Sequence, residues 1–338
     1  MQPLQDTFGR VHKDLRISVT DRCNFRCQYC MPEEGMTWLD KSDVLDFDEI
    51  FRVAKILVKK FGLESIRLTG GEPTLRKQLD VLIKQLATLD VELSMTTNGT
   101  TLVRQAEGLR KAGLKRLNVS IDSLDRSKFA DLTKQDRLND VLAGIDAAVD
   151  AGFDPVKINV MLMKGINDDE ILDFLEFGLE RGVTVRFIEF MPLDAGEGWS
   201  NDDVVSAQDI LAAASTKYEF TRPPRGSSPA ELFTYWPKDA PGPELGTNAQ
   251  VGDFGIIASV TEPFCGDCDR TRLTSDGQFR NCLFALGHLD LRGMLRSEAT
   301  DDEIASAMQG EVLRKRSGHA IGDVYFVRPT KSMSQVGG

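Results

Sequence analysis

Residues 15–31 decide the fold, and they read Leu-Arg-Ile-Ser-Val-Thr-Asp-Arg-Cys-Asn-Phe-Arg-Cys-Gln-Tyr-Cys-Met. The first six residues alternate apolar and polar side chains, which predicts a β-strand with one face of each kind. The strand leads directly to Cys23, Cys27 and Cys30. Loops that follow parallel strands carry the chemistry of barrel enzymes, so these three thiols are the first candidate site residues.

The same pattern continues to residue 191, with short β-branched runs followed by longer segments of helical periodicity. This alternation predicts βα units and a parallel sheet. The predicted strands are 15–20, 65–69, 91–96, 116–121, 156–163 and 183–191, and the predicted helices are 47–61, 79–89, 102–112, 139–151 and 169–181. Four of these helices precede a glycine, which favours the left-handed conformation of a helix end: Gly62, Gly113, Gly152 and Gly182.

The predicted strands keep polar residues on one face, although parallel strands covered on both sides usually read as continuous apolar runs. The crossover helices must cover the apolar face, so the polar face looks into whatever the sheet encloses. Polar-face positions include Arg16, Arg67, Thr96, Ser120 and Lys157. Because a closed eight-stranded barrel fills its lumen with apolar side chains, we expect an α/β fold, a partial (β/α)6 TIM-like barrel around a ligand. The alternative is a sheet with one face in solvent.

After residue 191 the pattern changes. Residues 223–252 are rich in Pro, Gly and Ser, which predicts a loop or linker with a short strand at 232–236. Strands at 254–260, 271–275 and 278–282, with a hairpin turn at Asp276-Gly277, and a helix at 301–313 predict a smaller α+β domain. We therefore expect a barrel domain over 1–200 and a second domain over 201–338.

Composition excludes several classes of protein. The chain has 338 residues and a net charge of -11, which disfavours electrostatic wrapping of nucleic acid. No apolar run approaches the roughly 18 residues of a membrane-spanning helix, and the first residues lack a secretory segment. We expect a cytoplasmic protein, where a reducing environment favours ligation by the six cysteines over disulfides.

A second set of three cysteines, Cys265, Cys268 and Cys282, lies in the predicted C-terminal domain. Each set is one ligand short of a closed zinc site. Three cysteines on a cubane cluster leave one iron open for a ligand. Zinc completed by a nearby carboxylate, Asp267 or Asp269, is the alternative for the second set. Arg270 and Arg272 have the charge and the geometry to bind phosphate.

The spacing Cys-x3-Cys-x2-Cys, with Tyr29 before the last cysteine, resembles the signature of the radical S-adenosylmethionine family. Residues 70–73, Gly-Gly-Glu-Pro, resemble that family's GGE motif. Further motifs at Arg67, Thr96 and Asn118, and the terminal Gly337-Gly338, extend the resemblance over the whole chain, to the branch of the family that acts on GTP in molybdenum cofactor biosynthesis.

The resemblance implies two 4Fe-4S clusters and S-adenosyl-L-methionine as cofactors, with the six cysteines as cluster ligands. It implies that a 5′-deoxyadenosyl radical takes a hydrogen from C3′ of GTP and that C3′ then joins guanine C8. It assigns the S-adenosylmethionine contacts to Tyr29, Gly71, Ser120 and Met191, and the GTP contacts to Arg16, Arg67, Thr96, Lys157, Arg270, Thr271 and Arg272. Gly337 and Gly338, with Arg16, are implied to be catalytic.

The resemblance also implies partners: an electron donor such as flavodoxin or ferredoxin, the synthase that makes cyclic pyranopterin monophosphate from the product, and a second copy of the chain in a homodimer. Neither nucleic acid nor a membrane is expected. Two other functions stay open at this point. One is a radical enzyme that modifies a peptide, and the other is a zinc- or cluster-stabilised binding protein without turnover.

Overall fold

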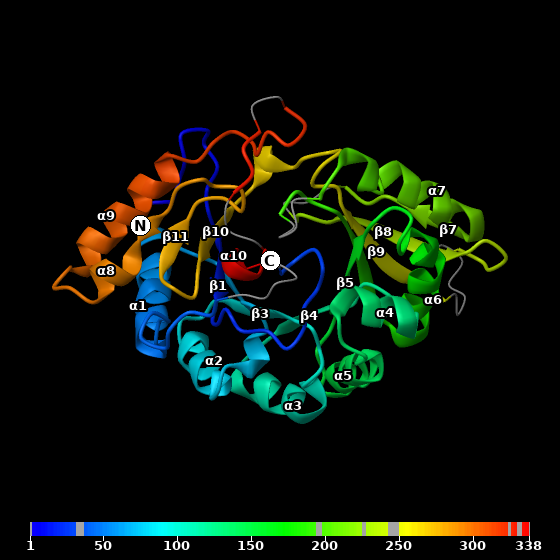
Figure 1. Ribbon diagram of the computed structural model, residues 1–338, viewed down its shortest axis with the longest axis horizontal. Coiled ribbons are helices and arrows are strands. Elements are labelled where there is room, and N and C mark those ends of the chain that lie inside the picture. The colour runs from blue at the N-terminus through cyan, green and yellow to red at the C-terminus, as the bar shows by residue number, and fades with distance from the viewer. Residues whose placement is uncertain are drawn as a thin grey trace.

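A computed structural model of the chain describes residues 2–31, 37–193, 198–224, 228–242, 250–323, 326–329 and 333–337. Within these ranges twelve strands form one sheet, in the order β12-β11-β10-β1-β2-β3-β4-β5-β6-β9-β8-β7. The sheet curves around a central space in which the C-terminal helix α10 (Met333–Val336) lies (Figure 1). No helix among these described residues is long and apolar enough to cross a membrane.

The strands are β1 (Asp14–Ser18), β2 (Ser65–Thr69), β3 (Glu92–Thr97), β4 (Arg116–Ser120), β5 (Val156–Leu162), β6 (Thr184–Glu189), β7 (Tyr218–Thr221), β8 (Glu231–Pro237), β9 (Gly252–Ile257), β10 (Arg270–Leu273), β11 (Gln278–Arg280) and β12 (Leu289–Asp290). The α-helices are α1 (Phe47–Ile56), α2 (Leu79–Ala87), α3 (Leu102–Ala112), α4 (Arg126–Thr133), α5 (Leu138–Asp150), α6 (Ile171–Arg181), α7 (Ala207–Lys217), α8 (Leu291–Leu295), α9 (Asp301–Leu313) and α10. A π-helical turn, Leu57–Phe61, continues α1.

The predicted fold class, a partial barrel of six βα units, is confirmed. Strands β1 to β6 pair in parallel and in chain order. Strands from the C-terminal region then extend the sheet in parallel at both edges, β10 beside β1 and β9 beside β6. The sheet ends at β12 and β7, so the barrel stays open. The boundary expected at residue 200 falls between β6 and α7, and the division into two domains stays a prediction.

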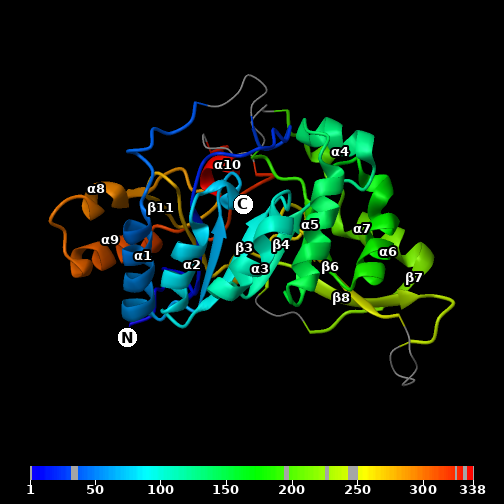
Figure 2. The same ribbon diagram turned by 90° about the horizontal axis from the view of Figure 1, so that it is seen from below.

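The crossover helices α2, α3 and α5 cover the outer face of the sheet, as the view from below shows (Figure 2). The apolar residues of the strands pack against them; Leu15, Ile17, Leu117 and Val119 are fully buried. Burial of apolar area at this interface is the main stabilising contribution to the fold. The opposite, polar face looks into the barrel, as the alternation predicts, so the alternative of a sheet face in solvent is wrong.

Most predicted elements agree with the structure to within a few residues, and α9 agrees at both ends. The four glycines after the predicted helices all have positive φ. Four of the described α-helices were not predicted: α4, α7, α8 and α10. The buried side of α7 consists of Ala207, Ile210 and Ala214, which give a weak apolar pattern, and α4 has only eight residues. Within the Pro- and Gly-rich stretch, the short strand is confirmed as β8, while residues 225–227 and 243–249 lie outside the described residues.

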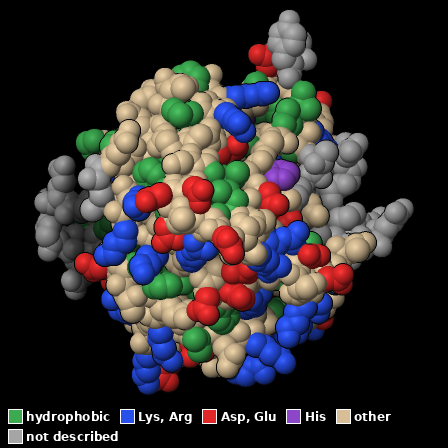
Figure 3. All heavy atoms as spheres, turned by 90° about the vertical axis from the view of Figure 1, so that its left-hand side faces the viewer, with side chains coloured by type: hydrophobic (Ala, Val, Ile, Leu, Met, Phe, Trp, Pro, Cys, Tyr) green, Lys and Arg blue, Asp and Glu red, His purple; other side chains and the backbone are tan. Residues whose placement is uncertain are grey.

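Helix α9 covers one edge of the sheet, next to α1 and α8. The surface there mixes acidic and basic side chains (Figure 3). Arg52 pairs with Asp301 at 2.8 Å and Lys60 with Asp302 at 2.5 Å. Because exposed ion pairs contribute only about 0–1 kcal/mol each, the helix is held mainly by its buried apolar residues, Ile304, Met308 and Val312.

We predict that Gly144→Ala destabilises the barrel. A Cβ at Gly144, in α5, would stand 2.2 Å from the carbonyl oxygen of Gly99, so α5 must move away from the loop between β3 and α3. The free energy of unfolding in urea, followed by circular dichroism, should fall by about 1–3 kcal/mol. Gly108→Ala, in α3, is the control, because a Cβ there meets no atom within 4 Å. That variant should gain up to about 1 kcal/mol, and equal stabilities of the two variants would contradict the packing argument.

Candidate active site

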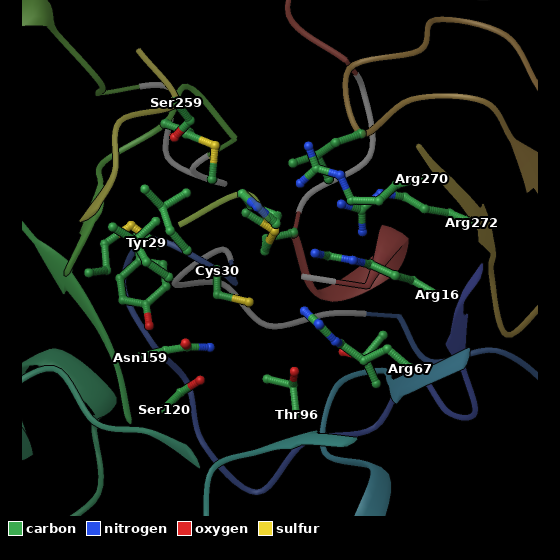
Figure 4. A pocket seen from close by; sticks show the side chains of 18 of the residues that line it. Arg16, Tyr29, Cys30, Arg67, Thr96, Ser120, Asn159, Ser259, Arg270 and Arg272 are labelled. Atoms are coloured by element: carbon green, nitrogen blue, oxygen red, sulfur yellow. The ribbon is translucent and has the colours of Figure 1, made fainter. Parts of the chain in front are cut away.

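A single cavity at the carboxyl ends of the strands is lined by residues from both ends of the chain (Figure 4). The lining includes all six cysteines, Cys23, Cys27, Cys30, Cys265, Cys268 and Cys282. None of them is in a disulfide. The structure therefore brings together two cysteine sets that lie more than two hundred residues apart in the sequence.

The loop that carries the first cysteine set follows β1 and is fixed on two sides. The backbone N–H groups of Arg26 and Gln28 donate to the carbonyls of Thr133 and Leu132, at the end of α4. Inside the loop, Cys30 N donates to Cys27 O at 2.9 Å. Burial, followed by the charges of Cys30 and Asp122, raises the pKa of the Cys27 thiol well above its usual range. A thiol of this kind is inert until a metal displaces its proton.

The Gly70-Gly71-Glu72-Pro73 segment, which follows β2, packs against the start of this loop. The N–H of Gly71 donates to Thr20 O at 2.8 Å, and a Cβ at Gly71 would stand 2.4 Å from Arg22 O. Only glycine allows this approach. The buried carboxylate of Glu72 accepts from Thr97 Oγ1 and Asn98 N, both at 2.6 Å, so it joins the ends of β2 and β3.

The second cysteine set lies on the loop before β10 and just after β11. Cys265–Asp267 forms a single helical turn, and Cys268 N donates to Cys265 O at 3.3 Å. The surroundings differ from those of the first set. Although burial raises it, the charges of Arg270 and Lys315 lower the pKa of the Cys268 thiol to about 7. This thiol is therefore the most readily ionised of those whose pKa is shifted.

Four arginines point into the cavity between the two sets: Arg16, Arg67, Arg270 and Arg272 (Figure 4). Strand register places Arg16 beside both Arg67 and Arg272. Burial and the charges of these neighbours lower the pKa of Arg16, whose Nε has no hydrogen-bond partner. Within the described ranges of the chain, none of the four forms an ion pair with a carboxylate. Arg16 and Arg272 are buried and Arg67 and Arg270 are half-buried, and positive charge gathered in this way favours an anionic ligand.

Other predicted contacts also line the cavity: Tyr29, Gly71, Thr96, Ser120 and Met191. The Tyr29 hydroxyl donates to Asp122 Oδ2 at 2.5 Å. Two predicted GTP contacts do not line it. Thr271 is fully buried on the opposite face of β10, where its hydroxyl donates to Asp14 O at 3.3 Å. Lys157 lies deeper in the barrel, and burial together with the charge of Arg186 lowers its pKa to about 8.

The end of the chain reaches the same cavity. The carbonyl of Gly337 accepts a hydrogen bond from Arg272 Nη1. A Cβ at Gly337 would stand 2.5 Å from Ser18 Oγ and 2.7 Å from Thr69 Cγ2, and its φ is +76°. Glycine is thus required by both space and backbone conformation. Gly338 lies outside the described residues.

The sequence reasoning missed Arg186 of β6, which lines the cavity and is buried. Its Nη2 donates to Asn118 Oδ1 at 2.8 Å and to Asn159 Oδ1 at 2.6 Å. Burial and the charge of Arg67 lower its pKa to about 9. The signal was present, because Arg186 lies between apolar Val185 and Phe187 in the same alternation that identified the other strands.

The fold and the cysteine loop define an enzyme of the radical S-adenosylmethionine class. Residues 17–178 match the Radical SAM superfamily, and residues 183–321 match the family described as Molybdenum Cofactor Synthesis C. In structure the chain is similar to Streptococcus suis SuiB bound to the precursor peptide SuiA, with a TM-score of 0.62 and 14% identity over 90% of this chain and 67% of that chain. This likeness concerns the fold alone. The superfamily implies a 4Fe-4S cluster and S-adenosylmethionine.

Sequence identity is much higher with proteins that match this chain over almost its full length. The chain is 49% identical to a GTP 3′,8-cyclase of Streptomyces coelicolor, over 99% of this chain and 96% of that protein. It is 49% identical to GTP 3′,8-cyclase 2 of Mycobacterium tuberculosis and 46% identical to a GTP 3′,8-cyclase of Corynebacterium glutamicum, over 99% of this chain and 92% and 89% of those proteins. The chain belongs to the GTP 3′,8-cyclase family.

We predict that Gly71→Ala abolishes metal binding at the first cysteine set alone. The added Cβ would displace the carbonyls of Asp21 and Arg22 and with them the loop that carries Cys23. After anaerobic reconstitution with iron and sulfide, the variant should hold roughly half of the iron of the native protein. Gly266→Ala, beside the second set, meets no atom within 4 Å and should keep all of it. Full iron content in Gly71→Ala would show that the close approach does not position the cysteines.

Proposed function

We propose that this enzyme converts GTP to (8S)-3′,8-cyclo-7,8-dihydroguanosine 5′-triphosphate, the first step of molybdenum cofactor biosynthesis. The observation that carries the proposal is the joint lining of one cavity by two cysteine sets and the four arginines Arg16, Arg67, Arg270 and Arg272. The names of the full-length relatives, all GTP 3′,8-cyclases, support the same reaction.

The cysteines fit iron-sulfur clusters better than zinc. Among the described residues, no group of His, Cys, Asp or Glu side chains converges closely enough to hold one metal ion. In a cluster each thiolate binds a different iron, so its cysteines stand farther apart than the ligands of a single ion. We assign a 4Fe-4S cluster to Cys23, Cys27 and Cys30, and a second one to Cys265, Cys268 and Cys282. Each set leaves one iron without a protein ligand.

The first cluster and S-adenosylmethionine, when bound, supply a 5′-deoxyadenosyl radical that takes a hydrogen atom from the substrate. The protein positions the second reactant. Tyr29, Gly71, Ser120 and Met191 line the same cavity as the first cysteine set, which supports their assignment to S-adenosylmethionine. Gly71 lets its strand end approach the backbone of Asp21 and Arg22 closely, which holds the cysteine loop in place beside the ligand.

The arginines account for recognition of the triphosphate. Arg16, Arg67, Arg270 and Arg272 offer fork-shaped donors that match phosphate oxygens. With the triphosphate held there, the guanine faces the second cysteine set and the ribose faces the first. The bond between C3′ and C8 joins two atoms of one molecule, so the protein contributes mainly by restricting its conformation and excluding water. Thr96 and Arg186 complete this wall of the cavity.

The remaining partners follow from the reaction. A one-electron donor such as flavodoxin or ferredoxin must reduce the first cluster. The radical left on the guanine after the C3′–C8 bond forms must gain one further electron and one proton, and a synthase must accept the cyclised triphosphate. A cytoplasmic location fits six free cysteines, because thiols stay reduced there. A homodimer stays a prediction of the family resemblance.

The proposed function is tested by an anaerobic assay of the reconstituted protein with dithionite, S-adenosylmethionine and GTP. Mass spectrometry should find 5′-deoxyadenosine and a cyclised isomer of GTP together. Deoxyadenosine without the cyclised nucleotide would contradict the assignment of GTP, and the absence of both from a protein replete in iron would favour a binding protein without turnover.

We predict that deletion of Gly337 and Gly338 abolishes cyclisation while the fold and both clusters remain. Gly337 contacts Arg272 and fills the space next to Ser18 and Thr69, so its loss opens the cavity where the ribose is expected. Iron content and circular dichroism should match those of the native protein, with no cyclised product.

The variants Gly337→Ala and Gly310→Ala keep the chain at full length. They therefore test whether the conformation at Gly337, and not only the length of the C-terminal segment, is needed for activity. Gly337→Ala introduces a clash at positive φ and should lose activity, whereas a Cβ at Gly310 in α9 meets no atom within 4 Å. Full activity in the truncated chain or in Gly337→Ala would refute a catalytic role for the C-terminal glycines.

A further inference from the structure

The N-terminal segment, residues 4–12, lies against the loop of the second cysteine set. It folds back on itself through a bridge between Gln5 and Val11. Arg10 Nη1 donates to Cys265 O at 2.7 Å and to Ser317 O at 3.0 Å. Arg10 is buried, and Asp6 holds its Nε at 2.6 Å. The two ends of the chain are therefore joined directly at the cysteines.

A buried lysine stands beside one of these cysteines. Lys315, only 4% exposed, places its Nζ 3.5 Å from Cys268 Sγ. The same nitrogen donates to Arg270 O at 3.0 Å, and the carbonyl of Cys268 lies 3.5 Å away. Nζ also lies 3.4 Å from Nδ1 of His12. Lysine is rarely buried without partners, so the site is built around this ammonium group.

His12 is oriented to accept from Lys315. Its Nε2 lies 3.2 Å from Asp6 Oδ2, and a carboxylate can only accept, so the ring proton belongs on Nε2. Burial, followed by the charge of Lys315, lowers the pKa of His12 to about 4, which keeps the ring neutral at pH 7. Nδ1 then carries a lone pair for a Lys315 N–H. Asp6 thus fixes the tautomer, and His12 directs the lysine toward the sulfur.

The two cysteine sets differ in the charges around them. Arg270 and Lys315 are the charged side chains with the largest effect on the Cys268 thiol, and both are basic. At the first set, carboxylates are close: Asp122 acts on Cys27 and Glu72 on Cys23. Binding of the triphosphate by the arginines does not require a lysine next to Cys268 but outside the cavity. Lys315 does not line the cavity.

We propose that Lys315 is a positioning residue that raises the reduction potential of the second iron-sulfur cluster through its contact with the sulfur of Cys268. This inference rests on the proposed assignment of that cluster. Reduction adds one negative charge to the cluster, and a cation held at its thiolate stabilises the reduced form more than the oxidised form. Because the site is buried, solvent screens this interaction little. The arrangement separates the potentials of two clusters that share one cavity.

The test is a redox titration of the anaerobically reconstituted protein, followed by electron paramagnetic resonance. The signal of the second cluster is assigned as the one that remains when Cys23, Cys27 and Cys30 are replaced by alanine. Lys315→Met keeps the length of the side chain and removes the charge. We expect at least a tenfold shift of the one-electron reduction equilibrium toward the oxidised form, about 59 mV. Lys315→Arg keeps the positive charge and should have a reduction potential close to that of the native protein.

Lys13→Met is the matched control, since Lys13 is exposed and pairs with Glu64 on the surface near the same loop. It removes one positive charge without touching a cysteine and should leave the potential unchanged. Equal potentials for the native protein and Lys315→Met would overturn the proposal. So would a shift of the same size in Lys13→Met, or a failure of Lys315→Arg to restore the potential.

If Lys315→Met does not retain the iron of the second set, His12→Leu is measured in its place, because it keeps the ammonium group and removes the acceptor that directs it toward Cys268. A lower potential supports the proposal, and an unchanged one overturns it. A native protein with iron at the first set alone would contradict the second cluster itself and therefore the proposed function. Two clusters with no effect at Lys315 would contradict only the role of the lysine.

Discussion

The parallel pairing of β10 with β1 is the constraint on which the site depends. It joins residues more than 250 positions apart in the sequence and aligns Arg16 with Arg272, while β2 brings Arg67 to the same level. The loop after β1, with Cys23, Cys27 and Cys30, then opens into the same cavity as Cys265 and Cys268 before β10 and Cys282 after β11.

The electrostatic character of the cavity follows from the same alignment. Burial of charged groups costs several kcal/mol per ion unless a counter-charge compensates. Arg16, Arg67 and Arg272 are nevertheless crowded together with lowered pKa values and no carboxylate partner in the described part of the chain. The protein folds with this unfavourable interaction because apolar burial elsewhere offsets it. A bound polyphosphate would relieve the repulsion among these arginines. The same charge therefore accounts for both the affinity for a polyphosphate and the preference for it over less charged ligands.

Much of this could be predicted from local patterns. The polar alternation along β1 to β5 placed Arg16, Arg67, Thr96 and Ser120 inside the barrel, because side chains of a strand alternate strictly between its faces. The same rule, applied consistently, would have found Arg186. It would also have placed Thr271 on the face opposite its neighbours Arg270 and Arg272. Three features could not be predicted, because no local pattern of residues encodes them. They are the pairing of β10 with β1, helix α7 with its mostly alanine buried side, and the contact of residues 4–12 with the second cysteine set.

The central claim is that the ribose of GTP lies within reach of the radical formed at the first cysteine set. The most direct measurement uses GTP labelled with deuterium at the ribose C3′ and follows the isotope by mass spectrometry. If the cavity holds both molecules as described, 5′-deoxyadenosine should carry one deuterium that came from C3′, and the cyclised product should lack it. Deoxyadenosine without deuterium, formed together with product, would show that the hydrogen comes from elsewhere and would contradict this arrangement.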